Sequence, residues 1–68
     1  MNRLPYLVTV IDKQYHATYY SIRVQHVDGR VEDVHIDSNR GALFHAILIG
    51  VEYRLHIEYG TLIGVAPQ

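Results

Sequence analysis

The stretch from residue 51 to residue 59, VEYRLHIEY, alternates apolar and polar residues without a break. This period of two predicts a β-strand in which one row of side chains faces a core and the other row faces solvent. The apolar row would consist of Val51, Tyr53, Leu55, Ile57 and Tyr59. A sheet with one solvated face is usually antiparallel. The strand therefore predicts an antiparallel sheet that buries one of its sides.

The length of 68 residues predicts a single domain over residues 1–68. A domain this small often depends on a disulfide, a metal or a partner subunit for additional stability. The chain has no cysteine, which excludes disulfides and thiolate metal sites. Because oligomerisation is the remaining route, we expect a homodimer.

The formal charge is −1, with six Lys and Arg against seven Asp and Glu. Domains that bind nucleic acid usually carry an excess of basic residues, so nucleic acid is the less favoured partner. The first residues show no small-residue cleavage pattern of a signal peptide. No apolar run approaches the roughly 18 residues of a membrane span. We therefore expect a cytoplasmic protein that does not enter a membrane.

The first half of the chain predicts three strands. Residues 5–12 form the first, with two largely apolar faces, and its position in the sheet stays open; residues 12–16 are polar and predict a loop. Residues 18–27 and 30–37 predict a hairpin with a three-residue loop that ends at Gly29. This loop length places Ile22 opposite Val34 and Arg23 opposite Asp33. It separates apolar from polar side chains, which a two-residue turn would not do.

Residues 42–49 form a continuous apolar run, which is compatible with a helix or with a buried strand. Apolar spacing of three and four favours the helix, with Ser38 or Asn39 as its N-cap and Gly50 at its end. The second hairpin would repeat the first, with Glu58-Tyr59-Gly60 as a three-residue loop. That loop would pair Leu55 with Ile63.

The resulting order is β-β-β-α-β-β. It predicts an α+β fold in which one helix packs on one face of a small antiparallel sheet. The alternative is a small all-β barrel in which residues 42–49 are a strand.

Catalytic and metal sites find little support in the sequence. The five histidines show no zinc-binding spacing, and no phosphate-binding or dinucleotide-binding glycine pattern is present. Ser21 could approach His35 and Asp33, but a flat sheet face supplies neither a pocket nor oxyanion donors. We therefore expect no enzyme activity, no catalytic residue, no metal and no cofactor.

The polar side of the sheet is the expected binding surface. Tyrosine and arginine are enriched at binding hot spots, and six of the 68 residues are tyrosines. We expect one patch that binds a partner protein, formed by Tyr19, Arg23, His35, Arg54 and His56. The predicted function is a protein-binding module that masks a partner's surface, similar in size and class to the accessory inhibitors and regulators of phages and plasmids. The alternatives are a single-stranded nucleic-acid-binding domain and a small structural subunit of a larger assembly.

Overall fold

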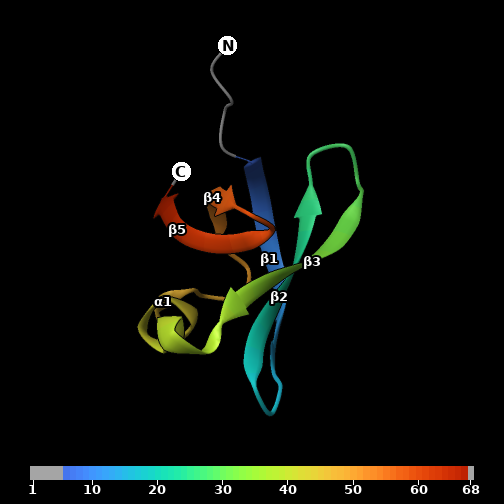
Figure 1. Ribbon diagram of the computed structural model, residues 1–68. Helices are drawn as coiled ribbons and strands as arrows, with labels where there is room; N and C mark the ends of the chain where they lie inside the picture. Colours follow the sequence, from blue (N-terminus) through green and yellow to red (C-terminus); the bar gives the residue numbers. More distant parts are fainter. Residues whose placement is uncertain (1–5, 68) are drawn as a thin grey trace.

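Three consecutive antiparallel strands form the first half of the chain in the computed structural model, which describes residues 6–67 (Figure 1). They are β1 (Tyr6–Tyr15), β2 (Tyr19–His26) and β3 (Val31–Asp37). β1 is longer than expected because it continues through the residues that the sequence predicted as a loop. The polar residues Asp12, Lys13 and Gln14 pair with β2. Pro5, the first residue of the predicted strand, lies outside the described residues.

The register of the β2–β3 hairpin is the predicted one. Ile22 lies opposite Val34 and Arg23 opposite Asp33. Gly29 has a φ of 93°, a left-handed conformation that glycine adopts without steric cost. The hairpin therefore buries Ile22, Val24, Val34 and Ile36, as the separation of polar and apolar side chains predicted.

The register predicted for the second hairpin is wrong. β4 (Glu52–Glu58) and β5 (Thr61–Pro67) are joined by a two-residue turn, so Glu58 pairs with Thr61 and Leu55 with Val65. Both turn residues have positive φ, 53° at Tyr59 and 76° at Gly60, which is typical of a type I′ hairpin turn. An irregularity between His56 and Ile57 then shifts the pairing. As a result Leu62, rather than Ile63, is fully buried.

Replacement of Tyr59 by Asn should stabilise the protein by about 0.5–1 kcal/mol, because Asn tolerates the left-handed conformation and Asn-Gly is the preferred type I′ pair. Tyr59 is fully exposed, so no packing is lost. Urea denaturation of the wild type and of Tyr59→Asn measures the difference. Tyr59→Ala is the control, because alanine lacks the short polar side chain through which Asn is stabilised in the left-handed conformation; an equal gain from Ala would refute the explanation.

The five strands close into a barrel in the order β1-β2-β3-β5-β4. β1 pairs with β2 from Val8 to Tyr15 and with β4 through residues 6–9, while β3 contacts β5 in parallel at His35 and Thr61. A bulge at Ile11 adds bending to β1. The prediction of an open sheet with a helix on one face is therefore wrong. The alternative, a small barrel, is correct in that the sheet closes.

The apolar run after β3 is a short helix and not the strand of that alternative. A 3₁₀ turn (Ser38–Arg40) leads into α1 (Gly41–Ala46). Neither Ser38 nor Asn39 acts as the predicted cap, since the N-cap positions are Asp37 and Arg40 and neither side chain makes a capping hydrogen bond. The helix ends before Gly50, which instead lies in the turn that precedes β4.

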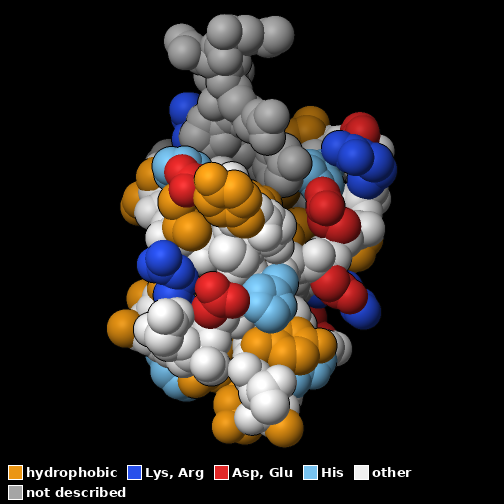
Figure 2. Space-filling view, in the orientation of Figure 1, with side chains coloured by type: hydrophobic (Ala, Val, Ile, Leu, Met, Phe, Trp, Pro, Cys, Tyr) orange, Lys and Arg blue, Asp and Glu red, His pale blue; other side chains and the backbone are white. Residues whose placement is uncertain are grey.

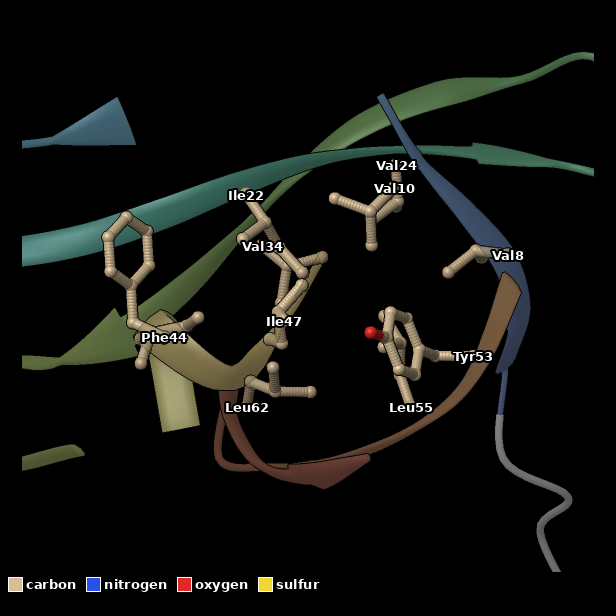
Figure 3. Packing of buried hydrophobic residues seen from close by; sticks show 11 residues of the cluster. Val8, Val10, Ile22, Val24, Val34, Phe44, Ile47, Tyr53, Leu55 and Leu62 are labelled. Carbon is tan, nitrogen blue, oxygen red and sulfur yellow. The ribbon is translucent and has the colours of Figure 1, made fainter. Parts of the chain in front are cut away.

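The core fills the barrel interior, and α1 covers one end of it (Figure 3). Phe44 of α1 stacks on Tyr20 of β2, with ring centroids 4.3 Å apart. Ile47, directly after the helix, is fully buried. Within residues 6–67 no helix has the length and apolar character needed to cross a membrane.

Candidate functional site

The outer surface of β2 and β3 carries a group of aromatic rings. Tyr19 begins β2 and faces away from the core, His35 projects from the adjacent β3, and His16 precedes Tyr19 in the short β1–β2 turn. We call this surface, with the rings of His16, Tyr19 and His35, the ring face. It exists because the confirmed β2–β3 register places Ser21 opposite His35 and Tyr19 opposite Asp37.

The Tyr19 ring stacks on both histidines. Its centroid lies 4.3 Å from that of His16, with 20° between the ring planes, and 4.8 Å from that of His35, with 24°. These separations lie at the short end of the range for favourable aromatic pairs. The three rings thus form one stack in which Tyr19 is exposed and the two histidines are half-buried.

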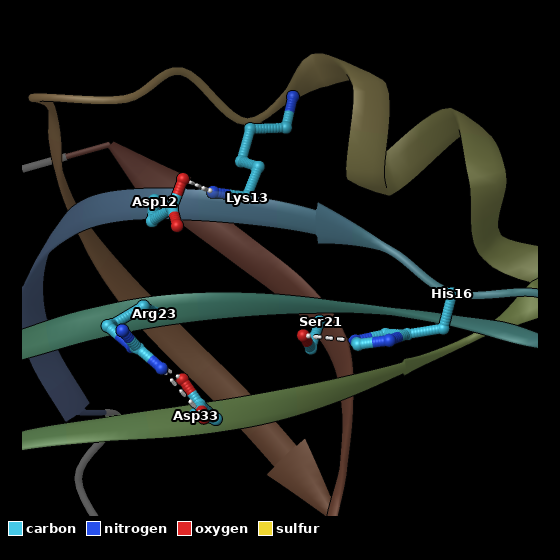
Figure 4. A network of polar contacts seen from close by, with 6 residues as sticks. All are labelled: Asp12, Lys13, His16, Ser21, Arg23 and Asp33. Atoms are coloured by element: carbon cyan, nitrogen blue, oxygen red, sulfur yellow. Dashed lines mark hydrogen bonds and ion pairs between the residues drawn. The ribbon is translucent and has the colours of Figure 1, made fainter.

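Hydrogen bonds fix the orientation of both histidines. Nε2 of His16 lies 2.9 Å from the Ser21 hydroxyl oxygen, and Nε2 of His35 lies 2.9 Å from a carboxylate oxygen of Asp37. Ser21 is itself buried, so the His16 ring is hydrogen-bonded to a side chain within the barrel wall. Figure 4 shows His16 reaching from the turn to Ser21 on β2. The stack is therefore ordered in the free protein.

An ion pair between Arg23 and Asp33 lies farther along the same surface. Nε of Arg23 donates to Asp33 at 3.0 Å, and a second guanidinium nitrogen lies 3.4 Å from the other carboxylate oxygen (Figure 4). The hydrogen bond and the charge of Arg23 lower the pKa of Asp33, and the same contacts raise the pKa of Arg23. The pair is exposed to solvent, so it orients Arg23 more than it stabilises the fold.

Acid should weaken this ion pair. The pKa of Asp33 is lower in the folded than in the unfolded chain, so its stabilising contribution is complete above the unfolded value of about 3.9 and is lost as pH falls through the folded value. We expect the stability difference between wild type and Asp33→Asn to shrink between about pH 6 and about pH 2. Urea denaturation at both pH values measures it. Arg23→Gln should give the same trend, and a difference that does not change with pH would contradict the assignment.

An open pocket of about 290 Å³ lies beside the stack. Its lining combines ring faces with hydroxyl, amide and carboxylate groups, from Gln14, His16, Tyr19, Ser21, Asp33, Val34 and His35. Such a mixture suits the recognition of a planar or amphipathic group more than that of a purely apolar one.

The ring face does not assemble a complete catalytic group. The Ser21 hydroxyl forms its hydrogen bond with His16, whereas the sequence suggested that Ser21 would approach His35. A serine nucleophile needs a base that a third group orients. Within residues 6–67 His16 has no hydrogen bond to a carboxylate. In the same range no group of three or more His, Asp or Glu side chains is placed to hold a metal ion.

The five predicted site residues do not form one patch. Tyr19, Arg23 and His35 lie together on the ring face, whereas Arg54 and His56 lie on β4. In the closed barrel β4 is separated from β3 by β5 and from β2 by β1. The expectation of a single patch is therefore wrong, because it assumed an open sheet with all polar side chains on one side.

The sequence reasoning missed His16. The prediction that His16 lies in a loop is correct, but the loop was expected to cover residues 12–16, whereas β1 continues to Tyr15 and only three residues separate it from β2. A tight turn of this kind brings the residue after β1 close to the start of β2. The short spacing of His16-Ala-Thr-Tyr19 is compatible with such a turn. The longer loop predicted for residues 12–16 left it unrecognised.

The side of the barrel that β3 crosses carries both signs of charge. Acidic and histidine side chains gather there, while the Lys and Arg side chains stand apart from one another (Figure 2). Comparison with protein families, characterised proteins and solved structures found no match for the chain.

Proposed function

We propose that this chain is a small, non-enzymatic module that binds another protein through the ring face. The observation that supports it is the partly exposed stack of Tyr19 with His16 and His35, beside an open pocket. Aromatic side chains that are ordered before binding lose little conformational entropy when a partner docks. Three adjacent rings also provide the concentrated contact area of a binding hot spot.

The proposed mode of action is steric. A convex barrel of this size acts by covering a functional surface of its partner, as accessory inhibitors and regulators do. Tyr19, His35 and the oriented Arg23 would make the central contacts. Because Arg23 is already paired with Asp33, its planar guanidinium is presented in a fixed position farther along the same surface.

Single-stranded nucleic acid is the second candidate, and the strand order favours it. A five-stranded barrel with these connections and a helix between β3 and β4 has the architecture of the oligonucleotide-binding (OB) fold, whose β2–β3 face binds its ligands. Bases could stack on the exposed rings.

The charges of the ring face make this the weaker candidate. Asp33 and Asp37 lie beside the rings, and the nearby cation Arg23 is already neutralised. Stacking alone contributes about 1–3 kcal/mol per base, so two bases without phosphate contacts correspond to a dissociation constant above about 10 μM. A partner protein need not carry the negative phosphates that Asp33 and Asp37 would repel.

The test compares three alanine variants in affinity capture from a native lysate of the source cells, read by quantitative mass spectrometry. Tyr19→Ala and His35→Ala should each reduce recovery of the same protein by at least about tenfold, as expected when a hot-spot residue is truncated. Tyr15→Ala is the matched control, because Tyr15 is an exposed tyrosine that contacts Tyr20 and lies off the ring face. Equal recovery with all three variants would reject the ring face as the binding surface.

Salt dependence separates the two candidates. Binding of a labelled oligothymidine or oligouridine would weaken steeply between about 50 mM and about 200 mM salt if phosphates contributed. We expect the dissociation constant for either oligonucleotide to lie above about 10 μM, the limit set by stacking alone. Tighter oligonucleotide binding that Tyr19→Ala abolishes would support the second candidate against the first.

A further inference from the structure

The outer side of β3 is paired over only a small part of its length. On its inner side β3 pairs with β2 along the whole strand, whereas within residues 6–67 its pairing with β5 is limited to His35 with Thr61. Figure 1 shows the tip of the β2–β3 hairpin standing away from β5. Residues 31–34 at the start of β3 therefore form a strand edge on which no strand of the described chain pairs. We call these four residues the β3 edge.

The backbone groups of this edge point alternately toward β2 and away from it. The Arg30 carbonyl accepts a hydrogen bond from the His26 N–H of β2. Alternation along the strand then directs the N–H and C=O groups of Val31 and Asp33 away from β2. The His35 carbonyl follows the same alternation, because it accepts a hydrogen bond from β5. Val31 and Asp33 thus present two donors and two acceptors in the arrangement that another extended chain can match.

The charges along β3 indicate what kind of chain that would be. β3 carries Glu32, Asp33 and Asp37 but no Lys or Arg, and β5 has no charged residue. The side chains of Glu32 and Asp33 are both exposed. Glu32 contacts the His26 imidazole, and the nearby cation Arg23 pairs with Asp33. Carboxylates therefore outnumber cations along the strand, which favours an adjacent strand with basic side chains.

The same charges disfavour a second copy of this chain at the β3 edge. A twofold pair of antiparallel edges can engage the outward groups of both Val31 and Asp33 only when Val31 lies opposite Asp33 of the second copy. That register places Glu32 directly opposite Glu32 of the second copy. Like charges directly opposite each other are destabilising, so the β3 edge does not complement itself.

We propose that the β3 edge binds an extended segment of a partner protein as an added strand, and that this segment carries lysine or arginine side chains. Backbone hydrogen bonds to Val31 and Asp33 would hold the segment, and its basic side chains would lie beside Glu32 and Asp33. Addition of a strand to an exposed sheet edge is a recurring mode of peptide recognition. The proposal goes beyond the ring face and requires no contact with Tyr19 or with the pocket beside it.

The test uses a blocked pentapeptide in which lysine and valine alternate, titrated to about 5 mM into the isotope-labelled chain and followed by NMR. The peptide should shift the amide signals of residues 31–34. It should also slow hydrogen exchange at the Val31 and Asp33 amides, because their N–H groups become hydrogen-bonded.

Two altered peptides separate strand addition from simple charge attraction. The lysine–valine peptide with every backbone amide methylated keeps its charges but donates no N–H, so it should bind at least about tenfold more weakly. A peptide with glutamate in place of lysine keeps every N–H but meets like charges, and it should also bind at least about tenfold more weakly.

The substitution Val31→Pro tests the edge from the side of the protein. Val31 is the first residue of β3, a position that proline tolerates in a strand, and its N–H points away from β2. Val31→Pro should bind the lysine–valine peptide at least about fivefold more weakly than Val31→Ala, the matched control that keeps the N–H. Circular dichroism verifies that both variants are folded.

The peptide comparison on the wild type remains decisive if Val31→Pro does not fold. The proposal would be overturned by unchanged signals of residues 31–34 at about 5 mM peptide, or by equal binding of the lysine–valine peptide and either altered peptide. Equal binding by folded Val31→Pro and Val31→Ala would overturn it as well. None of these results bears on partner capture by the ring face, which the Tyr19→Ala and His35→Ala variants test separately.

Discussion

Replacement of Ile22 by alanine should lower the free energy of unfolding by about 2–5 kcal/mol, the usual range for a buried isoleucine. Ile22 is completely buried in the barrel, opposite Val34 on the adjacent strand. A chain of 68 residues has a total stability of only about 3–10 kcal/mol. The substitution therefore removes a large share of it, and the midpoint of thermal unfolding should fall by at least about 10 °C.

Urea and thermal denaturation followed by circular dichroism measure this effect. Val31→Ala is the control, since Val31 lies on β3 of the same hairpin but is exposed, and its truncation should cost less than about 0.5 kcal/mol. Similar losses from the two variants would mean that the interior face of the β2–β3 hairpin is not the one described.

Truncation of Phe44 to alanine should have the second large effect, about 3 kcal/mol, at the lower end of the range for buried phenylalanine. The helix α1 has only six residues, and Phe44 is its one buried side chain. Its ring stacks on Tyr20 at 4.3 Å, and the Lys13 ammonium lies 4.7 Å from the ring centroid. A helix this short has no stability of its own, so loss of the ring should release it from the barrel end.

Two measurements identify the cause. Hydrogen exchange should show that the amides of residues 41–50 lose protection in Phe44→Ala, while those of β2 keep theirs relative to the lowered global stability. Phe44→Leu keeps an apolar side chain but removes the ring contacts, which are worth about 1 kcal/mol for an aromatic pair, so it should cost clearly less than alanine. Uniform loss of protection over the whole chain would contradict a local role for Phe44.

The sequence was sufficient for the existence of the five strands and for one hairpin, but not for the end of β1, which continues to Tyr15, nor for the end of β4 before Tyr59. Alternation identified which residues of β2, β3 and β4 face inward, and only one loop length at Gly29 separated polar from apolar side chains. The second hairpin was predicted incorrectly because Tyr59 adopts a positive φ, a conformation that is unfavourable for tyrosine and that no pattern indicates.

Barrel closure was not accessible from periodicity. Alternation shows which side of a strand faces inward, but it does not show which strand lies next to it outside a hairpin. The contacts of β1 with β4 and of β3 with β5 join segments that are distant in sequence. For the same reason Tyr19, Arg23 and His35 were grouped correctly within one hairpin, whereas Arg54 and His56 were assigned to a surface on which they do not lie.

The contact between β3 and β5 has a consequence for how the barrel fluctuates. In the described part of the chain its strand pairing is limited to His35 with Thr61, supplemented by a hydrogen bond from the Thr61 hydroxyl to the His35 carbonyl at 3.3 Å. We therefore expect transient opening of the barrel to begin between β3 and β5, where the fewest backbone hydrogen bonds must break. The imidazole of the same His35 stacks against Tyr19. A ligand that immobilises this imidazole would therefore also slow the opening of the barrel between β3 and β5. A contact at the surface would in this way make the barrel interior more rigid.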